Sequence, residues 1–540
     1  MNRRALLTGL AAVAAGNLLL PRSGPASAGG GEKLRDLPEL SSQGGVLDTS
    51  LDMAAHEVHL DGQVLTLDAY NGSTPGQVLR VRPGDTMRVL LRNMMRPTGI
   101  PLNSMPPLCS SKPGQHHHDH DLADCVSPAA EMMMHGHTGP QMMLATNLHT
   151  HGLQVSPEGN ADNVFVRVDP LGQFQYEYHI PHDQPAGMAW YHPHFHGSTS
   201  HAAWNGLAGP LIIEGDVDAV PEIAEMRERV LVVNELWVGD DTGEVPTARV
   251  VPIGGPVPFS SIPAVASSMM FPVNGQLVPE IDIRPGETQR WRLLNACPHR
   301  ALWLHVDGHD LHQIGQDGVP FAAPERVPNL MLSAGNRVEF IVQAGEPGRY
   351  RVYAERYDQG HPGGPRPRVH LATLVVAGTR TSGRIPATLV EPPRMPDLPI
   401  ARRRTLTFSG DISGRTGSGV VFRIDNQEYD LDRIDQEVEA GTVEEWTIVN
   451  DDVFQHPFHI HVNPFQIVDV QGIPADDTSW GAPDPTVWWD VFRVPPKGQF
   501  TLRTYFRPDV VGKTVYHCHI LPHEDNGMMG NILIRPAGAQ

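Results

Sequence analysis

Val81-Arg-Pro-Gly-Asp-Thr-Met-Arg-Val-Leu-Leu-Arg-Asn93 is the first of three similar stretches in this chain of 540 residues. The second is Ile283-Arg-Pro-Gly-Glu-Thr-Gln-Arg-Trp-Arg-Leu-Leu-Asn295, and the third is Val438-Glu-Ala-Gly-Thr-Val-Glu-Glu-Trp-Thr-Ile-Val-Asn450. Each copy begins with a turn that contains glycine and continues with alternating apolar residues, which is typical of a β-strand. A chain of this length has room for about three domains. The repetition therefore predicts an all-β protein of three consecutive β-sandwich domains with Greek-key connections.

The copies are unequally spaced, and an insertion explains the difference. After Asn93 about fifty residues rich in Met, His, Pro and Ser precede Thr146, whereas in the third repeat only five residues separate Asn450 from His456. Without an insertion at 94–144 the repeats would be nearly equidistant. Linkers are expected near 215–221 and in the Pro-rich run 378–399. We therefore expect the three domains at 46–216, 222–378 and 399–536.

The N-terminus has the pattern of a signal peptide over residues 1–28. A basic start is followed by an apolar run to Leu20 and by the small residues Ala26-Ser-Ala28,. Arg3-Arg4 favours the twin-arginine route, and Sec export is the alternative because Asn2 and Ala5 depart from the usual motif. We expect an exported protein, periplasmic or extracellular, with no membrane span in its mature part. A net charge of −20 and a pI of about 5.7 argue against nucleic acid or an anionic membrane as partners,.

Four His-x-His pairs dominate the rest of the chain, apart from one His-rich loop in the insertion. They are His149/His151, His192/His194, His459/His461 and His517/His519. A single pair of this kind is common and usually has no function. Four pairs supply eight imidazoles, enough for a cluster of several copper ions.

Around the last pair, one cysteine adds a different kind of copper ligand. Cys518 lies between His517 and His519, and His523 and Met528 follow shortly after it. With His456, they provide a thiolate, two imidazoles and a weak thioether, the ligand set of a blue-copper electron-transfer site. If these residues form a strand, Cys518 faces away from its two histidine neighbours. Three consecutive residues would then connect two copper sites.

These motifs resemble the four copper signatures of the multicopper oxidases, a family that includes laccases, bilirubin oxidases and bacterial copper-efflux oxidases. The signatures are His149-Thr-His-Gly152, Trp190-Tyr-His-Pro-His194, His456-Pro-Phe-His-Ile-His461 and His517-Cys-His519. The resemblance covers most of the mature chain, in the right order, with no ligand missing. It implies cupredoxin-like domains and four copper ions.

The resemblance also implies a role for each ligand. The type 1 copper would be held by His456, Cys518, His523 and, axially, Met528. The type 2 copper would be held by His149 and His459. The type 3 pair would be held by His151, His192, His194, His461, His517 and His519. A methionine as axial ligand implies a lower type 1 potential than that of the strongest laccases.

Two acids match carboxyls that the family keeps near its oxygen-reducing coppers. Asp162 follows the first histidine pair and matches an acid near the type 2 copper, although Asn163 stands where laccases often have glycine. Glu524 resembles the acid near the type 3 coppers of copper-efflux oxidases. Each could act as a general acid for reduced oxygen species. The alternative for each is an ordinary hydrogen-bonding carboxyl.

Other residues invite a functional interpretation that we set aside. His196 extends the second motif and is expected to be a hydrogen-bond partner of the ligands. Trp488-Trp489 reads first as strand core, with donor docking as a secondary alternative. No His-x-His pair lies between Asp218 and Gln455, so the second domain is expected to be a spacer, with the cluster between the first and third domains. Cys297 is expected to be a small buried hydrophobic residue.

The insertion leaves two interpretations open. It contains His116-His-His-Asp-His120 and, among its methionines, a group of five between residues 132 and 143, and thioethers bind soft Cu(I),. It could therefore carry extra copper. It could equally be a solvated loop closed by a Cys109–Cys125 disulfide, since these cysteines are close in sequence in an exported chain. The five methionines, called the insertion methionines below, are Met132, Met133, Met134, Met142 and Met143.

The leading hypothesis is a laccase-like oxidase that takes four single electrons from phenols or aromatic amines per O2. The runner-up is a metallo-oxidase that acts on Cu(I), which the insertion favours. In copper-efflux oxidases, however, the Met-rich segment lies elsewhere in the chain, near the type 1 site. A non-enzymatic copper store or envelope scaffold is a third alternative, but degenerate relatives of that kind lose ligands. A monomer is sufficient, because one chain supplies all three domains.

Overall fold

The computed structural model describes residues 31–60, 62–96, 144–239, 247–250, 266–361, 364–411 and 420–538. The expected signal peptide lies outside the described residues. So does nearly all of the insertion, including Cys109, Cys125, the His-rich run and the insertion methionines. The described chain forms six sheets, two for each of three successive units, so the all-β prediction is confirmed. No described helix is long and apolar enough to cross a membrane.

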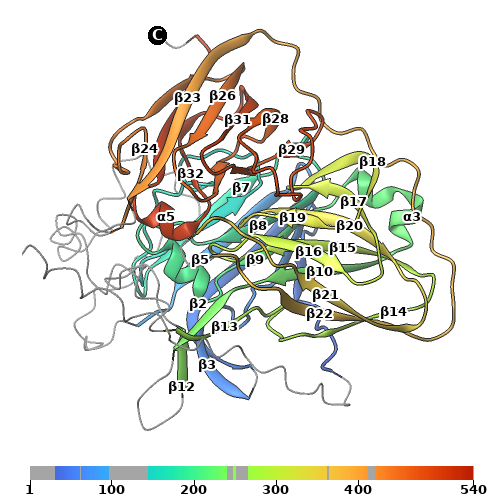
Figure 1. The fold of residues 1–540 in the computed structure, drawn as a ribbon. Coiled ribbons are helices and arrows are strands. Elements are labelled where there is room, and N and C mark those ends of the chain that lie inside the picture. Colours follow the sequence, from blue (N-terminus) through green and yellow to red (C-terminus); the bar gives the residue numbers. More distant parts are fainter. Residues whose placement is uncertain are drawn as a thin grey trace, which may run out of the picture.

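The first unit pairs a five-stranded sheet with a seven-stranded one (Figure 1). In spatial order the smaller sheet contains β1 (Glu39–Ser41), β4 (Val78–Val81), β9 (Gly209–Ile213), β8 (Gly187–His192) and β6 (His149–His151). The larger contains β13 (Ala266–Met270), β11 (Leu236–Gly239), β12 (Thr247–Val250), β3 (Gln63–Tyr70), β2 (Val46–Leu60), β5 (Thr86–Asn93) and β7 (Gln173–His179).

Two parts of this unit fall outside the expected domain limits. Strand β1 precedes residue 46, and β11 to β13 lie in the range expected for the second domain. β12 pairs in parallel with β3, which would otherwise be an open edge strand,.

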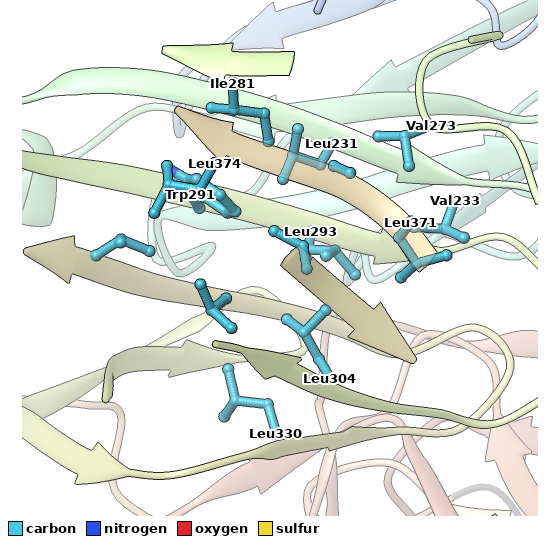
Figure 2. Packing of buried hydrophobic residues seen from close by; sticks show 14 of the residues in the cluster. Leu231, Val233, Val273, Ile281, Trp291, Leu293, Leu304, Leu330, Leu371 and Leu374 are labelled. Atoms are coloured by element: carbon cyan, nitrogen blue, oxygen red, sulfur yellow. The ribbon is translucent and has the colours of Figure 1, made fainter. Parts of the chain in front are cut away.

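The middle unit has two five-stranded sheets. One contains β10 (Arg227–Val233), β15 (Thr288–Asn295), β20 (Arg337–Gln343), β17 (Leu311–Gln316) and β18 (Val319–Val327). The other contains β14 (Glu280–Ile283), β22 (Val369–Val376), β21 (Gly348–Ala354), β16 (Leu302–Val306) and β19 (Leu330–Leu332). Side chains from the two sheets meet in an apolar core around Trp291 (Figure 2). Cys297 belongs to that core, as expected.

The third unit, orange to red in Figure 1, carries most of the candidate ligands. Its six-stranded sheet contains β24 (Val421–Ile424), β23 (Ile400–Asp411), β26 (Thr442–Asn450), β31 (Gln499–Phe506), β28 (Phe465–Gln471) and β29 (Trp488–Trp489). Its five-stranded sheet contains β25 (Gln436–Glu439), β33 (Met529–Arg535), β32 (Gly512–Cys518), β27 (His456–Ile460) and β30 (Val491–Val494). The described helices of the chain are short: α2 (Thr199–Trp204), η4 (Asp216–Ala219), α3 (Pro221–Ala224) and α5 (Leu521–Asp525).

The three repeated stretches occupy the same place in their units. Strands β5, β15 and β26 each run parallel to the first long strand of the unit, namely β2, β10 and β23. Each stretch ends in a fully buried asparagine: Asn93, Asn295 and Asn450. In all three, the side-chain amide donates to backbone carbonyls and its oxygen accepts the N–H two residues later. The asparagine thus fixes the loop after the strand, and in the third unit that loop leads to His456.

Candidate copper centres

Strand pairing brings the histidine motifs together. In the third unit β27 pairs with β32, which places Phe458 opposite Cys518 and His459 opposite His517. Because side chains alternate along a strand, Phe458 and Cys518 enter the apolar core, while His459 and His517 face the other side,. In the first unit the pairing of β6 with β8 places His149 opposite His192.

One group of side chains has the composition expected for a type 1 site. His456 Nδ1 and His523 Nδ1 lie 3.4 and 3.6 Å from Cys518 Sγ and 3.2 Å from each other. All three residues are buried. Met528 is fully buried in the same apolar cluster as Cys518, whereas Met529 packs in a different cluster with Val515. The geometry therefore favours Met528 over its neighbour as the thioether beside the cysteine.

Eight imidazoles gather between the first and third units. Nε2 of His194, His461 and His517 lie within 3.1–3.2 Å of one another. His149, His151 and His192 form a second group with ring nitrogens within 4.8 Å, and His149, His459 and His461 form a third. The ring of His519 lies 5.1 Å from that of His151. The structure thus brings together all eight histidines that the sequence motifs single out.

The bonding of these rings tests whether metal ions fit here. Several buried ring nitrogens have no hydrogen-bond partner: His149 Nε2, His151 Nδ1, His192 Nε2, His459 Nε2 and both nitrogens of His519. An unsatisfied buried polar atom costs about 1–3 kcal/mol. In four of these rings the other nitrogen contacts a carboxylate or a backbone carbonyl. That pattern of one anchored and one open nitrogen is what a metal-binding histidine needs.

Asp162 is one such anchor. Its Oδ2 lies 2.9 Å from His149 Nδ1, and its Oδ1 accepts hydrogen bonds from the backbone N–H and the hydroxyl of Thr150. The carboxyl is fully buried. Burial raises the pKa of Asp162 to about 7, although the hydrogen bonds from Thr150 act in the opposite direction.

Glu524, in α5, lies beside the three-histidine group. Its Oε1 is 3.5 Å from His194 Nδ1, and its Oε2 is 3.3 Å from His517 Nδ1. Thr199 donates a hydrogen bond to Oε1 from helix α2. Burial raises the pKa of the Glu524 carboxyl well above its usual range, and the negative charge of the neighbouring Asp525 raises it further.

Sequence reasoning missed a contribution from the middle unit. Arg337, at the start of β20, is fully buried and donates to both carboxylate oxygens of Asp490. Asp490 Oδ1 also lies 3.0 Å from His151 Nε2. The expectation that the second domain is only a spacer is therefore wrong. No motif marks Arg337, because its partner is distant in sequence and belongs to another unit.

The remaining candidates lie beside the site or away from it. The ring of His196 packs on Tyr429, with the ring centroids 4.6 Å apart. Trp488 is buried in the short strand β29, and Trp489 packs against the apolar core of the third unit. Both observations agree with the strand-core interpretation.

Comparison with known proteins identifies the family. Three family models described as multicopper oxidase match residues 140–218, 242–379 and 396–538. The laccase of Bacillus subtilis (strain 168) is 25% identical over 506 residues, which cover 89% of this chain and 93% of the laccase. The cell division protein FtsP of Escherichia coli (strain K12) is 29% identical over 374 residues, which cover 66% of this chain and 72% of FtsP.

The fold is shared with solved structures. A structure described as "Multicopper oxidase from Campylobacter jejuni: a metallo-oxidase" aligns with a TM-score of 0.70 at 23% identity, covering 94% of this chain and 96% of that chain. The matched regions span all three units and more than half of the sequence. This chain belongs to the multicopper oxidase family.

Proposed function

We propose that this protein is a laccase-like enzyme that takes single electrons from a phenolic or aromatic-amine donor. As a multicopper oxidase it is a copper-dependent oxidoreductase that uses O2 and four copper ions. When bound, the coppers supply one-electron oxidation of the donor at a type 1 site and four-electron reduction of O2 to water at a trinuclear site.

We assign the ligands as the sequence motifs imply. His456, Cys518, His523 and Met528 hold the type 1 copper, and His149 and His459 hold the type 2 copper. The type 3 pair is held by His151, His192, His194, His461, His517 and His519. The open ring nitrogens described above support this assignment.

The chain itself links the two sites. Cys518 lies in the type 1 group, while the rings of its neighbours His517 and His519 lie in the imidazole cluster. An electron that arrives at Cys518 therefore has a short covalent route to ligands of the type 3 pair.

Asp162 and Glu524 have two tasks in this proposal. Each orients ring nitrogens of the cluster: Asp162 holds His149 Nδ1 and leaves Nε2 open, and Glu524 lies between His194 and His517,. Each is also a buried carboxyl whose pKa is raised by burial, so that it can take up a proton close to the cluster. A buried carboxyl next to reduced oxygen can deliver that proton as a general acid.

The choice of an aromatic donor rests on the surroundings of His523. Phe422 stacks on its ring with the centroids 3.9 Å apart, and the rings of Phe454 and His361 lie 5.6 and 5.7 Å away. These aromatic rings around His523 favour an aromatic donor over a hydrated metal ion, because flat rings pack favourably on one another. The match to a laccase over 89% of the chain supports the same choice.

One observation favours a metal-ion donor instead. Asp452 Oδ2 lies 2.7 Å from His456 Nε2, and the Asp452 side chain is 10% exposed. A carboxylate that reaches from a type 1 ligand towards solvent could receive a cation such as Cu(I). Oxidation of Cu(I) is therefore the second candidate function.

The chain is also similar to FtsP, a cell division protein. We do not favour a non-enzymatic role such as a scaffold, because all twelve candidate ligands are present. Export to the periplasm or the outside of the cell remains part of the proposal, on the strength of the N-terminal pattern. A monomer is likewise proposed.

Rates of O2 uptake with a phenol and with Cu(I), measured side by side on the copper-loaded protein, test the choice of donor. We expect the higher kcat/KM with the phenol. The variant Cys518→Ser serves as the control for uncatalysed oxidation of each donor. A higher kcat/KM with Cu(I) would make the protein a cuprous oxidase.

A further inference from the structure

A buried ion pair joins all three units beside the imidazole cluster. Arg337 of the middle unit donates from Nη1 to Asp490 Oδ1 over 2.7 Å and from Nη2 to Asp490 Oδ2 over 2.5 Å. Its Nε donates to the carbonyl of Met188 in the first unit over 3.0 Å. Asp490 belongs to the third unit. A bidentate arginine–carboxylate pair of this kind fixes the orientation of the carboxylate as well as its charge.

Asp490 in turn holds two rings of the cluster. Its Oδ1 lies 3.0 Å from His151 Nε2, and its backbone carbonyl accepts a hydrogen bond from His459 Nδ1 over 2.6 Å. These two rings are stacked, with the centroids 3.9 Å apart and an interplanar angle of 9°. The nitrogens left open are His151 Nδ1 and His459 Nε2. Asp490 therefore sets which nitrogen of each ring carries the proton and which can bind a metal.

The turn that precedes Arg337 also lies close to a third ring of the cluster. A Cβ at Gly335 would come within 2.7 Å of the His519 ring, so a larger residue does not fit there without movement. Asn336 Nδ2 donates to Asp317 and to the carbonyl of Val491, next to Asp490. The middle unit thus meets the cluster along a closely fitted, hydrogen-bonded surface.

We propose that Arg337 is a positioning residue of the trinuclear copper site. It holds Asp490 in the orientation that presents His151 and His459 to the copper ions, so that the middle unit controls how tightly the type 2 and type 3 coppers bind. The type 1 site lies outside this network and should not depend on it. This inference rests on the ligand assignment proposed above.

The test compares Arg337→Leu with the wild type in copper content, type 2 electron paramagnetic resonance signal, type 1 blue absorption and competition with a chelator. Loss of such a contact typically weakens metal binding about 10- to 100-fold. We expect Arg337→Leu to retain the blue absorption and to lose affinity for the type 2 and type 3 coppers by that factor. The double variant Arg337→Leu/Asp490→Asn should recover part of the loss, because Asp490 then no longer carries a buried charge without its arginine.

Arg292→Leu is the matched control. Arg292 is also fully buried in the middle unit and paired with carboxylates, those of Glu228 and Glu339. The variant Arg292→Leu should lower the melting temperature of the protein without selective loss of type 2 or type 3 copper. Arg337→Lys keeps the charge but cannot make the two-pronged contact, and should give a smaller loss in the same coppers.

Unchanged affinity for all four coppers in Arg337→Leu, or in Arg337→Lys if the leucine variant does not fold, would overturn the proposal. Equal loss of type 1 and trinuclear copper would overturn it too, because it would indicate general unfolding. A wild-type protein without a type 2 signal overturns the ligand assignment and this inference with it.

Discussion

Replacing Asp162 by asparagine separates its role as an acid from its role as an anchor. In the wild type, Asp162 Oδ1 accepts from Thr150 N at 2.7 Å and from Thr150 Oγ1 at 3.0 Å, and it lies 3.1 Å from His149 Nδ1. An asparagine oxygen in the same place keeps these three contacts. Its amide nitrogen replaces Oδ2, which lies 2.9 Å from His149 Nδ1. The substitution therefore removes the ionisable carboxyl and the closer of its two contacts with this ring, and keeps the contacts through Oδ1.

The expected effect falls on O2 reduction alone. General acid catalysis contributes about 100- to 10,000-fold to a rate, which corresponds to about 3–5 kcal/mol in the barrier. We expect Asp162→Asn to slow reoxidation of the reduced enzyme by about 100-fold or more. Reduction by the donor in the absence of O2 should stay near the wild-type rate. Asp162→Ala should differ, because it leaves Thr150 N and His149 Nδ1 without a partner, and should weaken copper binding about 10- to 100-fold.

Stopped-flow mixing of reduced enzyme with O2 measures the reoxidation rate through the return of the blue absorption. Asp68→Asn is a suitable control, because Asp68 is also buried in the first unit, where burial raises its pKa to about 7. A reoxidation rate in Asp162→Asn within twofold of the wild type would refute the proton-donor role and leave Asp162 as an anchor.

The remaining predictions concern the cysteine, the insertion and acid stability. Cys518→Ser should abolish the blue absorption and all oxidase turnover, since it removes the thiolate, and a variant that stays blue contradicts the type 1 assignment. Replacing the insertion methionines by leucine should change phenol and Cu(I) oxidation slightly and together; a selective loss of Cu(I) oxidation would instead favour copper detoxification. Burial raises the pKa of Glu228, but Arg292 and Arg80 lower it more, to about 2. A lowered carboxyl pKa stabilises the fold above the ordinary value of 4.5 and ceases to do so as the pH falls towards 2,. The melting temperatures of wild type and Glu228→Gln should therefore differ most near neutral pH and converge over that window, and a constant difference speaks against the ion pair.

Local patterns in the sequence were sufficient for much of the fold. The three repeated stretches predicted the β-sandwich units, because an alternating strand after a glycine turn is a short-range signal. The terminal asparagine of each copy was visible as well, although its role in fixing the following loop also depends on carbonyls from other strands, such as those of Leu332 and Val494. The pairing of β12 with β3 could not be read from the sequence, because it joins segments that are far apart in the chain and lie on either side of an expected domain boundary.

The histidine pairs and Cys518 were found for a similar reason: their spacing along single strands determines which face each side chain takes. Arg337 and Asp490 were missed because they form one contact only after three units assemble. His361 was missed because it stands alone in the sequence, yet its ring lies 5.7 Å from that of His523. Sequence patterns report on neighbours along a strand and are blind to isolated residues brought in by another unit.

The most direct test of the proposed function is the number of donor electrons consumed per O2. Oxygen uptake and product formation are measured together with a phenol, and hydrogen peroxide is assayed in the same sample. We expect four electrons per O2 and no peroxide, because electrons collected singly are pooled at the trinuclear site before O2 is reduced to water. Two electrons per O2 with peroxide as the product, or no uptake by the copper-loaded protein, would contradict it.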